Sequence, residues 1–94
     1  MTAATRRRFL VKGHVQDVGF RAFALMNAER LGVIGWVRNL PDGRIVEVVA
    51  EADVHTLRTF EEQLRLGPPA ADVQIVERVE ADESEQLQGF EVRY

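Results

Sequence analysis

The pattern of apolar and polar positions predicts five strands along the chain. They cover residues 6–14, 34–40, 44–51, 72–80 and 90–94. In the first strand, Phe9 and Val11 alternate with residues of the opposite face, so we expect both to face the helices. The same alternation in the fourth strand predicts that Val73, Ile75 and Val79 share one face.

Two further segments have the apolar spacing of amphipathic helices. The first covers residues 20–31, with a stripe formed by Phe20, Ala24, Ala28 and Leu31. The second begins after Asp53, a favourable N-cap residue, and ends at Gly67-Pro68-Pro69. Its stripe consists of Val54, Leu57, Phe60 and Leu64. We expect both stripes to pack in the core.

The order of these elements is strand, helix, strand, strand, helix, strand, with a short fifth strand at the end. Pro41-Asp42-Gly43 has the chemistry of a hairpin turn, and each helix is long enough to cross over a sheet. This order predicts an α+β fold: a ferredoxin-like βαββαβ sandwich with two helices on one face of an antiparallel sheet. An open meander with loosely docked helices is the alternative. No linker divides the chain, so we expect one domain over residues 1–94.

Right-handed crossover makes the first two strands parallel, so they end at the same edge of the sheet. The third strand fits between them, which puts their ends roughly 10 Å apart. Asn39 ends the second strand, and its carboxamide both donates and accepts hydrogen bonds. By itself an asparagine before Pro-Asp-Gly is good turn chemistry, so a plain turn residue is the alternative.

The segment from Gly13 to Arg21 turns sharply between the first strand and the first helix. Such a turn can point several N–H groups into one concave space, and the helix N-terminus adds positive potential. Arg21 adds a full charge that no working pH removes. We therefore predict a site for a phosphoryl group, with a structural salt bridge as the alternative role of Arg21.

Composition and charge exclude several classes of function. The net charge of −3 argues against a general affinity for nucleic acid. There is no cysteine, no carboxylate cluster and no histidine set at metal spacing, which predicts chemistry without a metal. No apolar run approaches the ~20 residues of a membrane helix, and no signal peptide opens the chain. We expect a cytoplasmic monomer with no membrane partner.

Two motifs together resemble the acylphosphatase family. They are Gly13-His14-Val15-Gln16-Asp17-Val18-Gly19-Phe20-Arg21 and Gly35-Trp36-Val37-Arg38-Asn39. Gly67-Pro68 and the closing Gly89-Phe90-Glu91-Val92-Arg93-Tyr94 support the resemblance, which spans about residues 7–94.

The resemblance implies a ferredoxin-like fold and hydrolysis of small acyl phosphates without metal or other cofactor. It implies that Arg21 binds the phosphoryl group and that Asn39 positions the attacking water. The backbone cradle would consist of Gln16, Asp17, Val18, Gly19, Phe20 and Arg21, and a phosphate or sulfate ion would fit it.

Two positions depart from the family pattern. The family usually has glycine at the position of Asp17, and commonly a basic residue at that of His14. We expect the extra negative charge of Asp17 to weaken phosphate affinity. His14 as a general base is disfavoured, because it lies at the strand end before the cradle and the family does not use it. For Trp36, core or rim packing is favoured over a role as a stacking surface for an acyl group.

Three classes of function compete. The first is an acylphosphatase enzyme, and the second is a non-catalytic module that binds an acyl or carbamoyl phosphate, as in larger maturation enzymes. The third is an RNA-binding sheet, which needs exposed aromatic residues on its central strands. Residues 44–51 contain none, and the net charge is negative.

Overall fold

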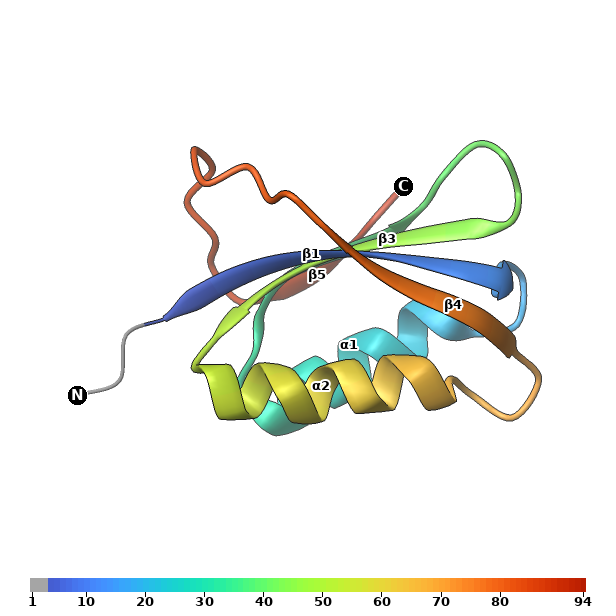
Figure 1. The fold of residues 1–94 in the computed structure, drawn as a ribbon, viewed down its shortest axis with the longest axis horizontal. Coiled ribbons are helices and arrows are strands. Elements are labelled where there is room, and N and C mark those ends of the chain that lie inside the picture. Colours follow the sequence, from blue (N-terminus) through green and yellow to red (C-terminus); the bar gives the residue numbers. More distant parts are fainter. Residues whose placement is uncertain (1–3) are drawn as a thin grey trace.

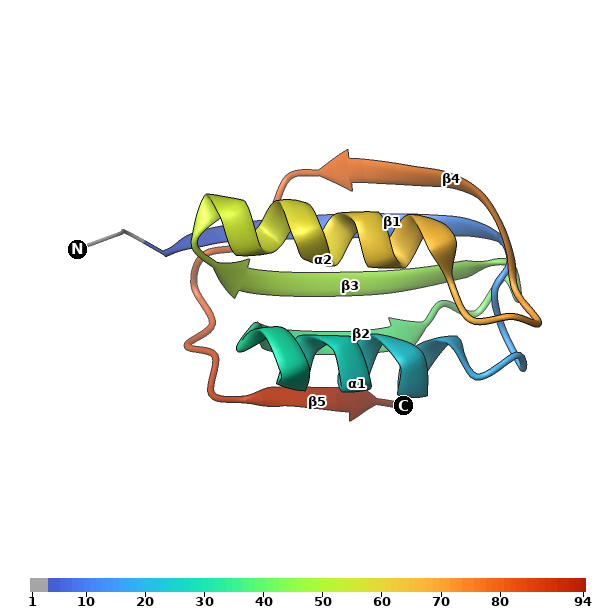
Figure 2. The same ribbon diagram turned by 90° about the horizontal axis from the view of Figure 1, so that it is seen from below.

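In the computed structural model, which describes residues 4–94, five strands form one sheet and two helices cover one of its faces (Figures 1 and 2). The elements are β1 (Thr5–His14), α1 (Phe20–Leu31), β2 (Ile34–Asn39), β3 (Ile45–Ala52), α2 (Val54–Leu66), β4 (Asp72–Val79) and β5 (Phe90–Arg93). Each begins and ends within one residue of its predicted bounds. The first three residues of the expected domain lie outside the described part.

The strand order is β4-β1-β3-β2-β5. β3 pairs antiparallel with both β1 and β2, so β1 and β2 run in the same direction and end at the same edge, as expected. β5 adds in parallel to β2, which makes the sheet mixed. The ferredoxin-like prediction is confirmed, and the open meander is excluded.

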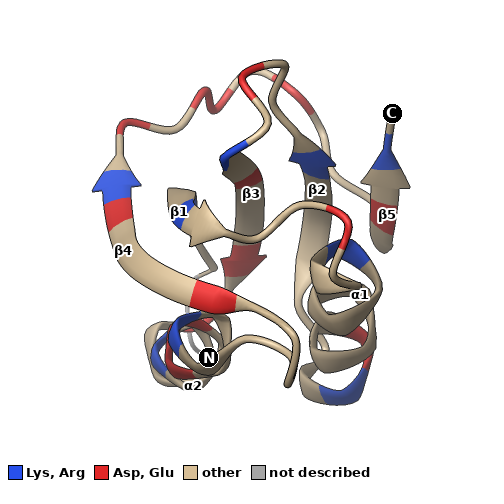
Figure 3. Cartoon of the chain, turned by 90° about the vertical axis from the view of Figure 1, so that its right-hand side faces the viewer, with Lys and Arg blue, Asp and Glu red and all other residues tan. Residues whose placement is uncertain are grey.

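The core fills the space between the helices and the sheet. Phe9 and Val11 of β1 are fully buried there, together with Phe20 of α1 and Phe60 of α2. Viewed end-on, α1 lies below β2 and β5, while α2 lies below β1 and β4 (Figure 3). The first turn of α1 is therefore held beside the edge of the sheet where β2 ends.

The prediction for the face of the fourth strand is wrong. Val76 is buried and pairs with Val11, whereas Ile75 is 56% exposed and pairs with Lys12. The register shifts after Lys12, because Gly13 pairs with Val73 and Gln74 is an extra residue. This β-bulge interrupts the alternation, so Val73 and Val76 share the helix face instead.

The predicted stripe of the second helix is right at three positions and wrong at one. Leu57, Phe60 and Leu64 are fully buried, but Val54 is 37% exposed. Val54 is the first residue of α2 and has helix neighbours on one side only. The Asp53 carboxylate caps this helix as expected, because it accepts a hydrogen bond of 2.9 Å from the Thr56 N–H. Neither described helix is long and apolar enough to cross a membrane.

Candidate active site

The loop between β1 and α1 has an unusual backbone. Asp17 has φ 62°, the only positive φ of a non-glycine residue among residues 4–94. Gly19, the N-cap of α1, has φ 81° and ψ 17°, in the left-handed region that glycine adopts without strain. These two left-handed residues bend the chain tightly into the first turn of α1.

The N-terminus of α1 lacks the groups that usually neutralise a helix start. Gly19 provides no side-chain cap, and the first turn contains no acidic residue. The first backbone bond runs from the Phe23 N–H to the Gly19 carbonyl at 3.0 Å. The N–H groups of the preceding helical residues have no acceptor within the helix. They are suited to an anion, which the helix dipole also favours.

A cavity of about 340 Å³ opens beside this helix terminus. Arg21 lines it from the first turn of α1, and Asn39 lines it from the end of β2. Asp17 and Gly19 contribute from the loop between β1 and α1. The topology thus places the Arg21 guanidinium and the Asn39 carboxamide beside one cavity, as the crossover rules predict.

Arg21 is not held in a salt bridge among the described residues. No carboxylate lies within 4.0 Å of it, whereas Arg6, Arg8, Arg38, Arg65, Arg78 and Arg93 each have such a partner. Its guanidinium carbon lies 4.7 Å from the centre of the Tyr94 ring. The alternative role of Arg21 as a structural ion-pair partner is therefore wrong, and its charge is available to a ligand.

Gln16 and Val18 are not among the residues that line the cavity. The Gln16 side-chain Nε2 donates to the carbonyls of Leu40 and Ile45, at 2.8 and 2.9 Å. It ties the loop to the β2–β3 hairpin, directly beside Asn39. The Val18 side chain packs against the core. Any contact of these two residues with a ligand would come from their main chain, whereas Phe20 does line the cavity.

His14 and Trp36 lie away from the cavity. His14 is exposed at the end of β1. Trp36 is only 9% exposed, and the guanidinium carbons of Arg38 and Arg93 lie 5.3 and 4.7 Å from its ring centre. Trp36 therefore packs on the sheet face opposite the helices. It does not offer a stacking surface at the predicted site.

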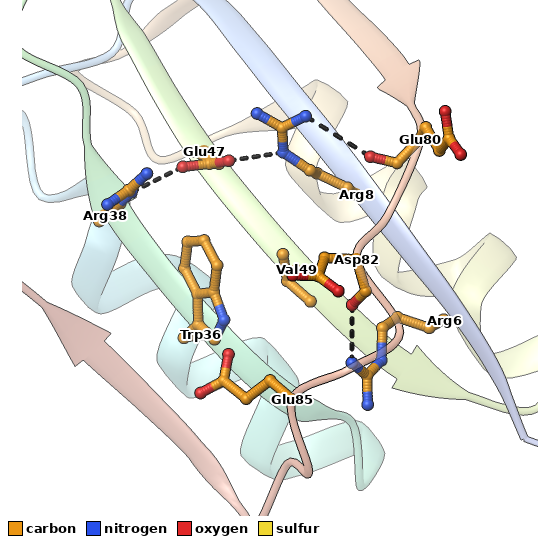
Figure 4. A pocket seen from close by; sticks show the side chains of 9 residues that line it. All are labelled: Arg6, Arg8, Trp36, Arg38, Glu47, Val49, Glu80, Asp82 and Glu85. Carbon is orange, nitrogen blue, oxygen red and sulfur yellow. Dashed lines mark hydrogen bonds and ion pairs between the residues drawn. The ribbon is translucent and has the colours of Figure 1, made fainter.

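A second cavity, of about 260 Å³, lies on that open face of the sheet (Figure 4). Its lining includes Glu47, which is 3% exposed and bridges Arg8 and Arg38. Burial favours the neutral acid, but hydrogen bonds from Arg38 and Arg8 outweigh it and lower the pKa of Glu47. The guanidinium groups of Arg6, Arg8 and Arg38 here are each paired with acceptors of the protein itself, so none of them is left for an anionic ligand.

The loop of residues 80–88 forms one side of this second cavity, with Glu80, Asp82 and Glu85 in its lining. Arg6 donates to the Asp82 carbonyl at 2.9 Å, and Arg93 binds Glu85. The buried indole N–H of Trp36 faces the Glu85 carboxylate without forming a well-aligned hydrogen bond (Figure 4). The arginines on the sheet face opposite the helices are therefore paired within the protein, and this face does not resemble a binding groove.

Sequence reasoning missed the apolar part of the first cavity, formed by Val15, Ala22, Leu25 and Val92 with Tyr94 at its edge. Leu25 follows Arg21 by four residues, so helical periodicity could have placed both on one side of α1. Val92 could not be found in this way, because its position depends on how β5 joins the sheet.

These features define a class: a small ferredoxin-like α+β protein with an anion-binding helix terminus at one end of its sheet. No group of three or more His, Asp or Glu residues in the described chain could hold a metal ion. A protein-family model described as Acylphosphatase matches residues 7–92. The chain belongs to the acylphosphatase family.

Relatives are similar to this chain over nearly its whole length. An acylphosphatase from Caldivirga maquilingensis is 44% identical over 100% of this chain and 99% of its own. The crystal structure of acylphosphatase from Bacillus subtilis has a TM-score of 0.88 and 36% identity, and covers 98% of this chain and 100% of its own. A structure of T. kodakarensis HypF has a TM-score of 0.82 and 30% identity over 94% of this chain, which matches only 12% of that protein.

Proposed function

We propose that this chain hydrolyses acyl phosphates to a carboxylate and inorganic phosphate in the cavity at the start of α1. The observation that carries the proposal is that Arg21 and Asn39 line one cavity, next to a helix N-terminus that has no side-chain cap. Family membership supports the same reaction.

The phosphoryl group would bind at the helix terminus. Its oxygens accept hydrogen bonds from main-chain N–H groups between Gln16 and Arg21, and the Arg21 guanidinium neutralises its charge. Such fixed donors need no rearrangement as negative charge shifts during the reaction. Inorganic phosphate or sulfate would compete for the same place.

The attacking water would be held by Asn39. Its side-chain carbonyl accepts a hydrogen bond from the water while its NH₂ group can donate, so one orientation is favoured. Because phosphoryl transfer depends mainly on positioning and charge stabilisation, an oriented water and a neutralised phosphoryl group suffice. The leaving group is a carboxylate, already stable as an anion, so the mechanism uses no general acid. His14, outside the cavity, has no part in it.

The test is hydrolysis of acetyl phosphate in excess chelator by the wild type, Arg21→Ala and Asn39→Ala. We expect full wild-type turnover, a loss of about 10³-fold or more for Arg21→Ala and about 10²- to 10³-fold for Asn39→Ala. Arg58→Ala, an exposed arginine of α2, is the control and keeps wild-type turnover. Circular dichroism checks that each variant is folded.

Turnover that disappears with the chelator would contradict the metal-free mechanism. The competing proposal, a passive module that binds an acyl or carbamoyl phosphate, requires phosphate binding with no hydrolysis by the wild type. Calorimetric titration with inorganic phosphate separates the two, since the passive module would bind and not turn over. That the protein works as a cytoplasmic, single-domain monomer stays a proposal from its sequence, and sedimentation velocity tests the oligomeric state.

A further inference from the structure

The side chain of Gln16 joins the two loops that meet at the candidate active site. Its Nε2 donates to the carbonyls of Leu40 and Ile45, at 2.8 and 2.9 Å. Gln16 belongs to the loop between β1 and α1, and the two carbonyls belong to the β2–β3 hairpin at the same end of the molecule (Figure 2). Within residues 4–94, these are the only side-chain hydrogen bonds that connect residues 15–21 with another part of the chain.

The hairpin presents two carbonyls that suit a donor with two hydrogens. The Leu40 carbonyl also accepts from the Gly43 N–H at 3.3 Å, and the Ile45 carbonyl also accepts from the Leu40 N–H at 2.9 Å. A carbonyl oxygen has two lone pairs, so the Gln16 amide takes the second position on each. The reverse orientation of the amide would place its oxygen against both carbonyls, and this contact therefore fixes which way the amide points.

Asn39 lies directly before these contacts. It forms the last residue pair of β2 with β3, opposite Val46, and Leu40 and Ile45 are the next residues on the two sides of the hairpin. Among the described residues, no hydrogen bond to the protein fixes the Asn39 carboxamide. Its position therefore depends on the backbone of the strand end, which Gln16 ties to the loop before α1.

We propose that Gln16 is a positioning residue for the hydrolysis, and that its side chain sets the position of Asn39 relative to the N-terminus of α1. This inference rests on the proposed function of the cavity. The water is held by the hairpin and the phosphoryl group by the loop and Arg21, so the two reactants are held by different segments. Gln16 acts through the hairpin, and its side chain touches neither reactant. Phosphoryl transfer depends on alignment, and a displacement of about 1 Å can lower the rate by up to about 10²-fold.

The test is a double-mutant cycle of Gln16→Met and Asn39→Ala with acetyl phosphate as substrate. Methionine keeps nearly the length and shape of glutamine but donates no hydrogen bond. We expect Gln16→Met to lower kcat about tenfold in the wild-type background and less than about twofold in the Asn39→Ala background, because it acts through Asn39. KM and the inhibition constant of inorganic phosphate stay within about twofold of wild type, because the main chain and Arg21 bind the phosphoryl group. The control is Gln63→Met, at a half-buried glutamine of α2 outside the cavity, which keeps the wild-type kcat.

Gln16→Glu tests the same contact through its dependence on pH. The carboxylate faces two carbonyl oxygens, which raise its pKa, whereas the protonated acid donates one hydrogen bond to them. We expect the kcat of this variant relative to wild type to rise several-fold between about pH 7.5 and about pH 5. The kcat of Gln16→Met relative to wild type stays constant over the same range.

Two kinds of result overturn the role of Gln16 while hydrolysis itself stands. One is an unchanged kcat in Gln16→Met. The other is an equal decrease of kcat in both backgrounds, or an inhibition constant for phosphate that rises as much as kcat falls, since each indicates a general loosening of the site.

A wild type that does not hydrolyse acetyl phosphate overturns the proposed function, and the role of Gln16 with it. Circular dichroism checks that each variant is folded. If Gln16→Met does not fold, the pH profile of Gln16→Glu decides, and a relative kcat that does not rise at low pH overturns the proposal.

Discussion

Asp17 is the one acidic residue among those that line the candidate active site. Its left-handed backbone, with φ 62°, is one that aspartate tolerates better than most non-glycine residues. Asp17 is exposed, and it lines the cavity that Arg21 also lines. A carboxylate beside a bound phosphoryl group repels it, and salt screens that repulsion.

We predict that Asp17→Gly lowers KM for acetyl phosphate by about two- to fivefold at low ionic strength, and that the difference shrinks in high salt. Asp17→Asn separates the effect of the charge on KM from the effect of backbone flexibility, since asparagine also adopts left-handed conformations but carries no charge. The measurement is KM at about 10 mM and about 500 mM salt, where the Debye length falls from ~30 Å to below ~8 Å. A KM that is unchanged or raised at low salt in both variants would rule out the electrostatic role.

At the scale of elements, the site depends on how β2 joins its neighbours. Gly35 shows how closely β2 approaches β3, because a Cβ added there would lie 1.8 Å from the Val49 carbonyl oxygen. Its φ of 146° is also unfavourable for other residues. Gly35 moreover donates to the Gly89 carbonyl at 2.8 Å, at the start of β5. One glycine therefore allows both β3 and β5 to dock on the strand that carries Asn39.

We predict that Gly35→Ala reduces the free energy of unfolding by about 2–4 kcal/mol, from the clash together with the strained backbone. Urea denaturation at pH 7 measures it. Gly43→Ala is the matched control: its φ is 83°, but no atom lies within 4 Å of the added Cβ, so only backbone strain of about 1 kcal/mol is expected. An equal loss of unfolding free energy in the two variants would show that the close approach of β2 to β3 at Gly35 does not contribute to stability.

The whole molecule has two unlike faces, with the site at one end between them. The helix face is an apolar core, and the open face is crossed by the ion pairs of Glu47 with Arg8 and Arg38. This carboxylate joins β1, β2 and β3 at once. Its pKa is lowered from the ordinary value of 4.5, because the hydrogen bonds from Arg38 and Arg8 exceed the opposing effect of burial.

A carboxylate with a lowered pKa in the folded state contributes stability above its unfolded pKa, and that contribution is lost as pH falls through the folded pKa. We therefore predict that Glu47→Gln lowers the free energy of unfolding by about 1–3 kcal/mol at pH 7. The difference from wild type should shrink as pH falls below 4.5. Denaturant titrations from pH 7 to pH 3 measure it, with the exposed Glu83→Gln as control for net charge. A difference in unfolding free energy that stays constant with pH would contradict the lowered pKa of Glu47 in the folded protein.

Much of the fold was predictable because its signals are local. The alternation along the strands, the helix stripes, the Asp53 cap and the Pro41-Asp42-Gly43 turn depend on residues close in sequence, and together they predicted every element. The rules of chain crossover then predicted the strand order β1-β3-β2. The same rules predicted that Arg21 and Asn39 would face one space, and both line the cavity. Their catalytic roles stay predictions.

The sequence by itself therefore determined the elements, their order and the end of the sheet where the site lies, since periodicity, capping and crossover handedness act along the chain. Only the tertiary structure decided which side chains meet across strands. The bulge at Gln74, the burial of Glu47 and the position of Leu25 and Val92 beside the first cavity depend on strand register and on how β5 docks. These are set by packing between distant segments, which no local pattern in the sequence encodes.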